Sequence, residues 1–317
     1  MRMRIGIVTD SCCDLPRSYL DEHGIVILPI TIQDSEGQTF IDNRDTAATL
    51  KFYKERLESG NAGYESAPYT IEEIRKLFLD KLVVEFDYVF CLTVMSSRSK
   101  IHENASQAAL GILNSYKPIR ENANVTGPFS LRVFDTNNLF TGQGLIVGEV
   151  ARMAAAGKST LEIIRQIERL QKTTQAFLIP ENLGQLRTQA RRKGDKSVGL
   201  MSYMMGSALD IKPVIRGFQG DTEPVARIRG FETGVQKLFD VAVSHIETGL
   251  DAPIVTVSYG GDPARVAALP GFDRLQKAAQ QHGVAVIVSE MSLTAGVNIG
   301  TGGVSVAFAS PREATLD

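Results

Sequence analysis

An apolar, β-branched run near the start of the chain ends abruptly in polar side chains. Residues Ile5–Thr9 are followed directly by Asp10 and Ser11. This pattern predicts a buried strand with hydrogen-bonding groups at its carboxyl end, where open α/β sheets place their ligands. No glycine fingerprint follows, which argues against a nucleotide phosphate on a helix N-terminus. Thr9, Asp10 and Ser11 are therefore candidate ligand-binding residues, and the alternative is that Asp10 or Asp14 caps the next helix.

Strand-like and helical segments alternate through the first half of the chain, which predicts a doubly wound, mostly parallel sheet. The expected strands are Ile5–Thr9, Gly24–Ile32, Tyr88–Thr93 and Leu131–Asp135, and the expected helices are Ala48–Ser59, Ile71–Leu82, Ser99–Tyr116 and Gly142–Ala156.

A glycine stop followed by a new helix cap, at residues 157–160, predicts a boundary between two domains, 1–157 and 158–317. Several strands of the second half have hairpin-length links, which predicts an α+β domain with a mixed or antiparallel sheet. Its expected strands are Gln175–Ile179, Ile211–Ile215, Pro224–Arg229, Ile254–Tyr259, Ala285–Ser289 and Gly303–Phe308, with helices at Glu181–Ala190, Val198–Leu209 and Phe231–Gly249.

Charge and composition exclude several classes of partner. The chain has 317 residues, a net charge of −2 and 43% hydrophobic residues. It therefore offers no basic field for nucleic acid, and no apolar stretch reaches the roughly 18 residues that span a bilayer. Cys12 and Cys13 are adjacent and Cys91 lies in an apolar run, so we expect neither a disulfide framework nor a metal site. A cytoplasmic protein with a small neutral or lipidic ligand fits this balance.

Short motifs follow one another along the chain in a specific order. They are Thr9-Asp10-Ser11 with Asp14-Leu15-Pro16, Ser66-Ala67-Pro68, the segment 96–101, Asp135-Thr136, Gly142-Gln143-Gly144, and Lys212-Pro213 with the strand after it. In this order and spacing they resemble the DegV family, bacterial fatty-acid-binding proteins, along nearly the whole chain.

The resemblance implies that the chain holds one long-chain fatty acid between its two domains and presents it to a separate kinase, without catalysis or a cofactor of its own. Burial of the tail supplies most of the affinity, at roughly 0.8 kcal/mol per methylene, and hydroxyl groups orient the head. Ser66, Ser97 and Ser99 are the expected head-group hydroxyls. Met201, Met204 and Met205 are expected to line the tunnel for the acyl tail.

The chain departs from the family pattern at the expected head-group site. Glu65 stands at a family threonine, Lys100 and Ile101 follow Ser99 where the family has glycine and threonine, and Asn298 stands at a family histidine. A glutamate beside a carboxylate is a like-charge pair. One of the two groups is then protonated, or Lys100 or Arg98 neutralises the site, or the head group is not an acid.

Two other functions compete with this interpretation. A hydrolase or acyltransferase could use Ser99, with His102 on the same helical face, although no Gly-x-Ser-x-Gly elbow is present. A small-substrate domain similar to part of dihydroxyacetone kinase would need a histidine to hold a carbonyl substrate, and none stands in a matching loop. No P-loop or kinase signature is present either.

Overall fold

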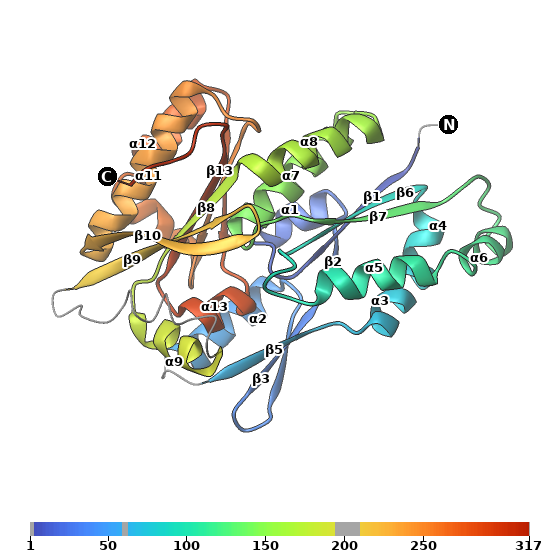
Figure 1. Ribbon diagram of the computed structural model, residues 1–317, viewed down its shortest axis with the longest axis horizontal. Coiled ribbons are helices and arrows are strands. Elements are labelled where there is room, and N and C mark those ends of the chain that lie inside the picture. Colours follow the sequence, from blue (N-terminus) through green and yellow to red (C-terminus); the bar gives the residue numbers. More distant parts are fainter. Residues whose placement is uncertain (1–2, 59–62, 194–209, 317) are drawn as a thin grey trace.

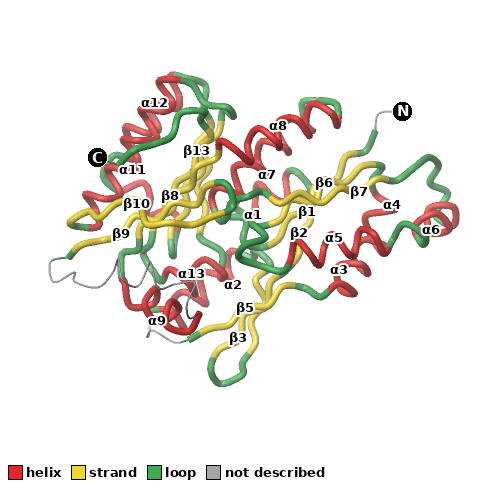
Figure 2. The backbone as a smooth tube through the Cα atoms, in the orientation of Figure 1, coloured by secondary structure: helices red, strands yellow, loops and turns green. Residues whose placement is uncertain are grey.

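Three sheets organise the chain, one parallel, one mixed and one small and antiparallel (Figure 1). The computed structural model describes residues 3–58, 63–193 and 210–316. The strands of the two larger sheets lie in separate parts of the molecule, with helices between and around them (Figure 2).

The first sheet is fully parallel. Its order is β2 (Val26–Leu28), β1 (Ile5–Asp10), β6 (Tyr88–Thr93), β7 (Ser130–Asp135). Alternate side chains of β6 enter different cores: Val89 packs with α5 (Ile101–Gly111), and Phe90 packs with α7 (Thr141–Ala155). Helices therefore cover both faces, which confirms the predicted doubly wound architecture.

The segment predicted as one strand, Gly24–Ile32, is divided between two sheets. β2 ends at Leu28, and β3 (Ile30–Asp34) pairs instead with β4 (Thr39–Asp42) and β5 (Tyr64–Pro68). Pro29 lies at the division, and proline cannot donate a ladder hydrogen bond. The sequence pattern did not predict this three-stranded sheet.

The second large sheet is mixed, as predicted. Only β11 (Ile254–Tyr259) and β12 (Ala285–Glu290) pair in parallel, and the other neighbours in the sheet are antiparallel. The strand order is β10 (Asp221–Arg229), β9 (Ile211–Phe218), β8 (Thr174–Ile179), β13 (Val304–Ala309), β11, β12. Helices α11 (Phe231–Thr248) and α12 (Phe272–Gln281) pack in the core of one face of this sheet.

Helix α7 lies between the two large sheets (Figure 1). It shares one core with β1 and β6 on one side and with β8, β11 and β13 on the other. Gly144 allows the close approach, because a Cβ there would lie 2.9 Å from the carbonyl oxygen of Asp14. The next helix, α8 (Thr160–Thr173), begins at Ser159 with a capping box to Glu162, as its sequence indicates.

Several predicted helices are interrupted or shorter in the structure. The predicted helices 48–59 and 71–82 each contain a π-helical turn, at Tyr53–Leu57 and Phe78–Leu82. Within the predicted helix Ser99–Tyr116, α5 ends at Gly111, a turn follows, and a separate helix, α6, begins at Tyr116. The predicted helix Val198–Leu209 lies outside the described residues. The remaining bounds are α1 (Arg17–Glu22), α2 (Thr46–Phe52), α3 (Ile71–Leu77), α4 (Val83–Glu85), α6 (Tyr116–Asn122), α9 (Leu183–Lys193) and α13 (Leu293–Ile299).

Candidate functional site

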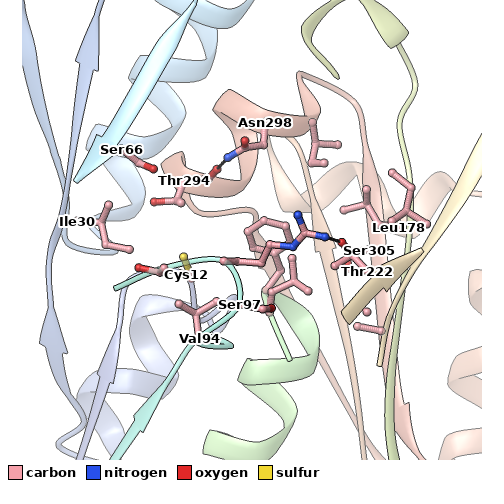
Figure 3. Close-up of a pocket in the computed structure, with 18 of the residues that line it drawn as sticks. Cys12, Ile30, Ser66, Val94, Ser97, Leu178, Thr222, Thr294, Asn298 and Ser305 are labelled. Carbon is pink, nitrogen blue, oxygen red and sulfur yellow. Dashed lines mark hydrogen bonds between the residues drawn. The ribbon is translucent and has the colours of Figure 1, made fainter. Parts of the chain in front are cut away.

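A cavity of about 680 Å³ lies between the parallel sheet and the mixed sheet (Figure 3). One wall comes from the segments that follow β1, β6 and β7, together with β3 and β5. The facing wall comes from β8, β9, β10, β13, α9 and α13. The cavity therefore lies at the carboxyl ends of the parallel strands, the edge that the opening sequence pattern indicated.

Asp10 joins the ends of two parallel strands. Its carboxylate accepts hydrogen bonds from the Val94 N–H at 2.7 Å and the Cys12 N–H at 3.0 Å. Burial raises the pKa of Asp10 to about 6, although these hydrogen bonds oppose the shift. The side chain thus fixes the loops that carry Cys12 and Val94 into the cavity wall.

Thr9, Asp10 and Ser11 are not among the residues that line the cavity. All three are buried, and the Thr9 hydroxyl accepts a hydrogen bond from the Gln143 amide at 3.0 Å. The cavity lining therefore does not include these three expected ligand-binding residues, and Asp10 supports the wall from behind through its bonds to Cys12 and Val94.

The serines expected at the head group do line the cavity. Ser66 lies on β5, and Ser97 and Ser99 lie in the loop before α5. The Ser97 hydroxyl donates to the Gly220 carbonyl at 2.7 Å, and the Ser99 hydroxyl accepts from the Ile101 N–H at 3.2 Å. The loop is thus held by the β9–β10 turn and presents its hydroxyl groups at the start of a helix.

Glu65 lies outside this cavity, in contrast to the expectation. In the ladder between β3 and β5, Ser66 pairs with buried Ile32, whereas Glu65 pairs with Gln33. Successive strand residues point to opposite faces, so Glu65 faces away from the side that Ser66 shares with Ile32. Glu65 is therefore not positioned to make the anticipated like-charge contact with a carboxylate bound in this cavity.

Lys100 and Asn298 line the cavity, as expected from the sequence. The Asn298 amide donates to the Thr294 carbonyl within α13 at 2.6 Å. Met201, Met204 and Met205 lie outside the described residues. The apolar lining that is described comes instead from Ile30, Pro68, Val94, Leu139, Phe140, Leu178, Leu186, Ile215 and Ile299.

Sequence reasoning missed several polar residues of the wall. Thr222, Thr294 and Ser305 come from the second half of the chain, and no motif there marks them. The Thr294 hydroxyl and N–H both lie 2.9 Å from one oxygen of Asp42, and the Ser305 hydroxyl lies 2.6 Å from that of Thr141. Only the long-range packing of two sheets brings these groups together.

A buried charged cluster joins the two halves behind the cavity. Arg44 donates to the Glu290 carbonyl at 2.9 Å and lies 3.8 Å from an oxygen of Asp14. Asp14 also accepts from the Ser258 hydroxyl at 2.7 Å and the Ser292 N–H at 2.9 Å. Asp14 therefore links the two halves of the chain rather than capping a helix. Its burial raises its pKa to about 6.

The side chains proposed for a serine hydrolase are not paired with each other. Nδ1 of His102 lies 3.1 Å from the Thr93 hydroxyl, whereas the Ser99 hydroxyl accepts from a backbone N–H. Burial also raises the pKa of the Cys12 thiol well above its usual range, so the thiolate that a cysteine nucleophile requires is disfavoured. The geometry does not favour nucleophilic catalysis at either residue.

A partly apolar cavity lies between the parallel sheet and the mixed sheet. This arrangement defines an α/β protein that encloses a small molecule between its two large sheets. A family model described as an uncharacterised protein, DegV family, matches residues 4–311. The chain belongs to the DegV family, which confirms the resemblance. Among the described residues no helix is long and apolar enough to cross a membrane.

Bacterial relatives cover nearly the whole chain. A DegV domain-containing protein of Xanthomonas axonopodis pv. citri is 48% identical over 98% of this chain and 99% of its own length. One from Streptomyces coelicolor is 26% identical over 98% of this chain and 100% of its own.

Solved structures share the fold at lower identity. The stearic acid-binding protein of Eubacterium ventriosum has a TM-score of 0.76 at 20% identity, covering 98% of both chains. A DegV family protein of Thermus thermophilus, described by its fatty acid binding, has a TM-score of 0.74 at 23% identity, covering 97% of this chain and 100% of its own. The Fatty Acid Kinase (Fak) B3 protein of Streptococcus pneumoniae, loaded with linoleic acid, has a TM-score of 0.69 at 18% identity, covering 97% of this chain and 99% of its own.

Proposed function

We propose that this protein binds one long-chain fatty acid, or a related acyl lipid, in the cavity between its two sheets. The observation that carries the proposal is the cavity itself: its volume of about 680 Å³ lies within the usual range for ligand sites, and its wall combines many apolar side chains with hydroxyl and amide groups. The fatty acids described for proteins of the same fold fit such a cavity.

The acyl tail lies against the apolar lining, including Ile30, Leu178 and Ile215, and is stabilised by roughly 0.8 kcal/mol for each buried methylene. The carboxyl end lies near Ser66, Ser97, Ser99, Lys100 and Asn298. The hydroxyl and amide groups orient the carboxyl end of the ligand, while burial of the acyl tail supplies most of the binding free energy.

The protein acts as a carrier in the cytoplasm and performs no reaction on its ligand. It presents the bound acid to a separate fatty acid kinase. The support for this partner is the Streptococcus pneumoniae protein of the same fold, which is named as part of a fatty acid kinase. Domains 1–157 and 158–317 would then enclose the ligand from either side.

Native mass spectrometry of the purified protein tests the proposal. We expect one acyl lipid per chain, either co-purified or taken up from added palmitic acid, and released on denaturation. Ile215→Trp should reduce uptake at least about tenfold, because the indole ring occupies space in the cavity that the tail requires.

Leu161→Trp is the matched control, because Leu161 is an exposed residue of α8 away from the cavity. It should leave uptake unchanged. A wild-type protein that neither carries nor takes up an acyl lipid contradicts the proposal, as does equal uptake by the two tryptophan variants.

A further inference from the structure

Arg98 connects the two walls of the cavity. It belongs to the loop after β6 on the first wall, and its guanidinium donates a hydrogen bond to the hydroxyl of Thr222, on β10 in the second wall. Figure 3 shows this bond as a dashed line to Thr222. The neighbouring Ser97 makes its own bond to Gly220, so the loop and the β9–β10 turn are held together at two adjacent points.

The charge in this part of the cavity is unbalanced. Two cations, Arg98 and Lys100, line it, and no carboxylate is among the lining residues that the structure describes. The ion-pair partner of Arg98 within the described chain is Asp221, at 3.9 Å, and the Asp221 side chain is 86% exposed. An ion pair of this length at the surface contributes little, because water and salt screen it.

The guanidinium of Arg98 has more hydrogen-bonding capacity than these contacts use. Arginine carries five N–H donors in a planar fork that matches the two oxygens of a carboxylate. In the described structure its hydrogen-bonded partner is a single hydroxyl. An anionic, two-oxygen group in the cavity offers this side chain a stronger partner than Thr222 does.

We propose that Arg98 is the counter-ion for the head group and makes the cavity selective for an ionised carboxylate over an uncharged acyl group. The inference rests on the proposed binding of an acyl chain and adds the residue that determines the charge of the head. Arg98 exchanges its hydrogen bond to Thr222 for the carboxylate, with Lys100 as a second positive charge nearby.

Binding of two probes separates charge recognition from tail burial. The probes are palmitic acid and its uncharged analogue hexadecanol, each measured by displacement of a fluorescent fatty acid at pH 8 and low salt. Wild-type protein should prefer the acid. Arg98→Gln should lower the affinity for the acid at least about tenfold, because charge-assisted hydrogen bonds are lost, and leave the affinity for hexadecanol unchanged.

Two further variants control for indirect effects. Thr222→Val removes the partner of Arg98 but keeps the guanidinium, so it should retain the preference for the acid. Arg274→Gln makes the same substitution at an exposed residue of α12 that pairs with Asp240, and it should behave as wild type.

Three results separate the hypotheses. If Arg98→Gln keeps the wild-type preference for the acid, Arg98 is not the counter-ion, although binding of fatty acids still stands. If Thr222→Val loses the preference as completely as Arg98→Gln, the contact between the walls matters rather than the charge, and the inference is overturned. If wild-type protein binds neither probe, the proposed function itself fails.

Discussion

Asp10 and Asp14 show how burial changes the behaviour of ordinary carboxyl groups. Both are buried beside the cavity, and burial raises the pKa of each to about 6. Each carboxylate links separate elements of the fold. Asp10 accepts hydrogen bonds from the loops after β1 and β6, and Asp14 accepts hydrogen bonds from Ser258 and Ser292 in the second half. These residues belong to the framework of the site rather than to its surface.

The contribution of Asp10 to the stability of the protein should therefore increase as the pH falls from 7.5 to 5. The folded state holds the proton of Asp10 with a pKa of about 6, against 3.8 for the usual carboxyl, so uptake of the proton stabilises the fold below about pH 6. At about 1.4 kcal/mol per pKa unit, the gain down to pH 5 is about 1.4 kcal/mol, and the full contribution of about 3 kcal/mol is reached only below the usual carboxyl pKa of 3.8.

Thermal melting of wild type and Asp10→Asn across this pH range measures the effect. The variant loses one acceptor for the two backbone N–H groups and is less stable overall. The difference in melting temperature between wild type and variant should grow as the pH falls, since only the wild type gains from protonation at residue 10. A constant difference from pH 7.5 to pH 5 would contradict the assignment.

Ser99 has two roles that can be separated by measurement. Its hydroxyl accepts a hydrogen bond from the Ile101 N–H before the first turn of α5 and also lines the cavity, so Ser99→Ala should cost about 1 kcal/mol of stability without ligand. Affinity for palmitic acid should fall by a further 0.5–1.5 kcal/mol, roughly the value of one neutral hydrogen bond. Ser106→Ala, on the same helix but not in the cavity wall, is the control in the same binding titration and should leave affinity unchanged.

Among single residues, the motifs shared with the family identified five that line the cavity, whereas Thr9, Asp10 and Ser11, named from the end of the first strand, do not line it. Ser66, Ser97, Ser99, Lys100 and Asn298 all line the cavity. Glu65 could not be placed correctly, because a strand turns successive residues to opposite faces and the register of β5 is set by β3.

Helix α7 is the element on which both large sheets depend. Its residues are buried almost all round, and it packs against β1 and β6 as well as β8, β11 and β13. Such a helix has no exposed polar stripe. The sequence pattern could locate the helix, but it could not reveal that two of its faces are covered by different sheets. The division at Pro29 was missed for a related reason: β2 and β3 are both apolar, and only the missing N–H separates them.

Two glycines of α7 give a matched test of its packing. Gly144→Ala should destabilise the protein by about 1–3 kcal/mol, because the new methyl group would lie 2.9 Å from a backbone oxygen that cannot move freely. At Gly148 the nearest atom to an added Cβ is a side-chain methyl of Ile254 at 3.6 Å, an ordinary contact.

Gly148→Ala should thus be neutral or slightly stabilising, since alanine is the better helix former. Urea unfolding of both variants measures the free energies. Equal destabilisation of the two would show that α7 is held less closely than the structure indicates.

At the scale of the whole molecule, the two sheets share one core and one buried charged cluster. Residues of both halves meet around α7, and Arg44 bonds across the boundary to Glu290. The alternation of strands and helices was enough to predict a parallel sheet followed by a mixed one, because each segment carries its own periodicity. It could not predict how tightly the halves are joined, because contacts distant in sequence determine that.

We expect the protein to unfold in urea as one cooperative unit rather than as two domains in sequence. Far-ultraviolet circular dichroism reports the helices, and tyrosine fluorescence reports tertiary packing in a chain without tryptophan. The two transitions should coincide. Two separate midpoints would show that residues 1–157 and 158–317 hold their structures independently.

The position of β13 has a consequence for how the protein is made. This strand comes from residues 304–309, near the end of the described chain, yet it lies between β8 and β11 in the middle of its sheet. During synthesis on the ribosome, β8 and β11 have no common partner until residue 309 has emerged. The part of α7 that packs against β13 therefore stays uncovered until that strand is made. Apolar surface left open for that interval is the kind that chaperones bind, so we expect the two halves to complete their fold together rather than one after the other.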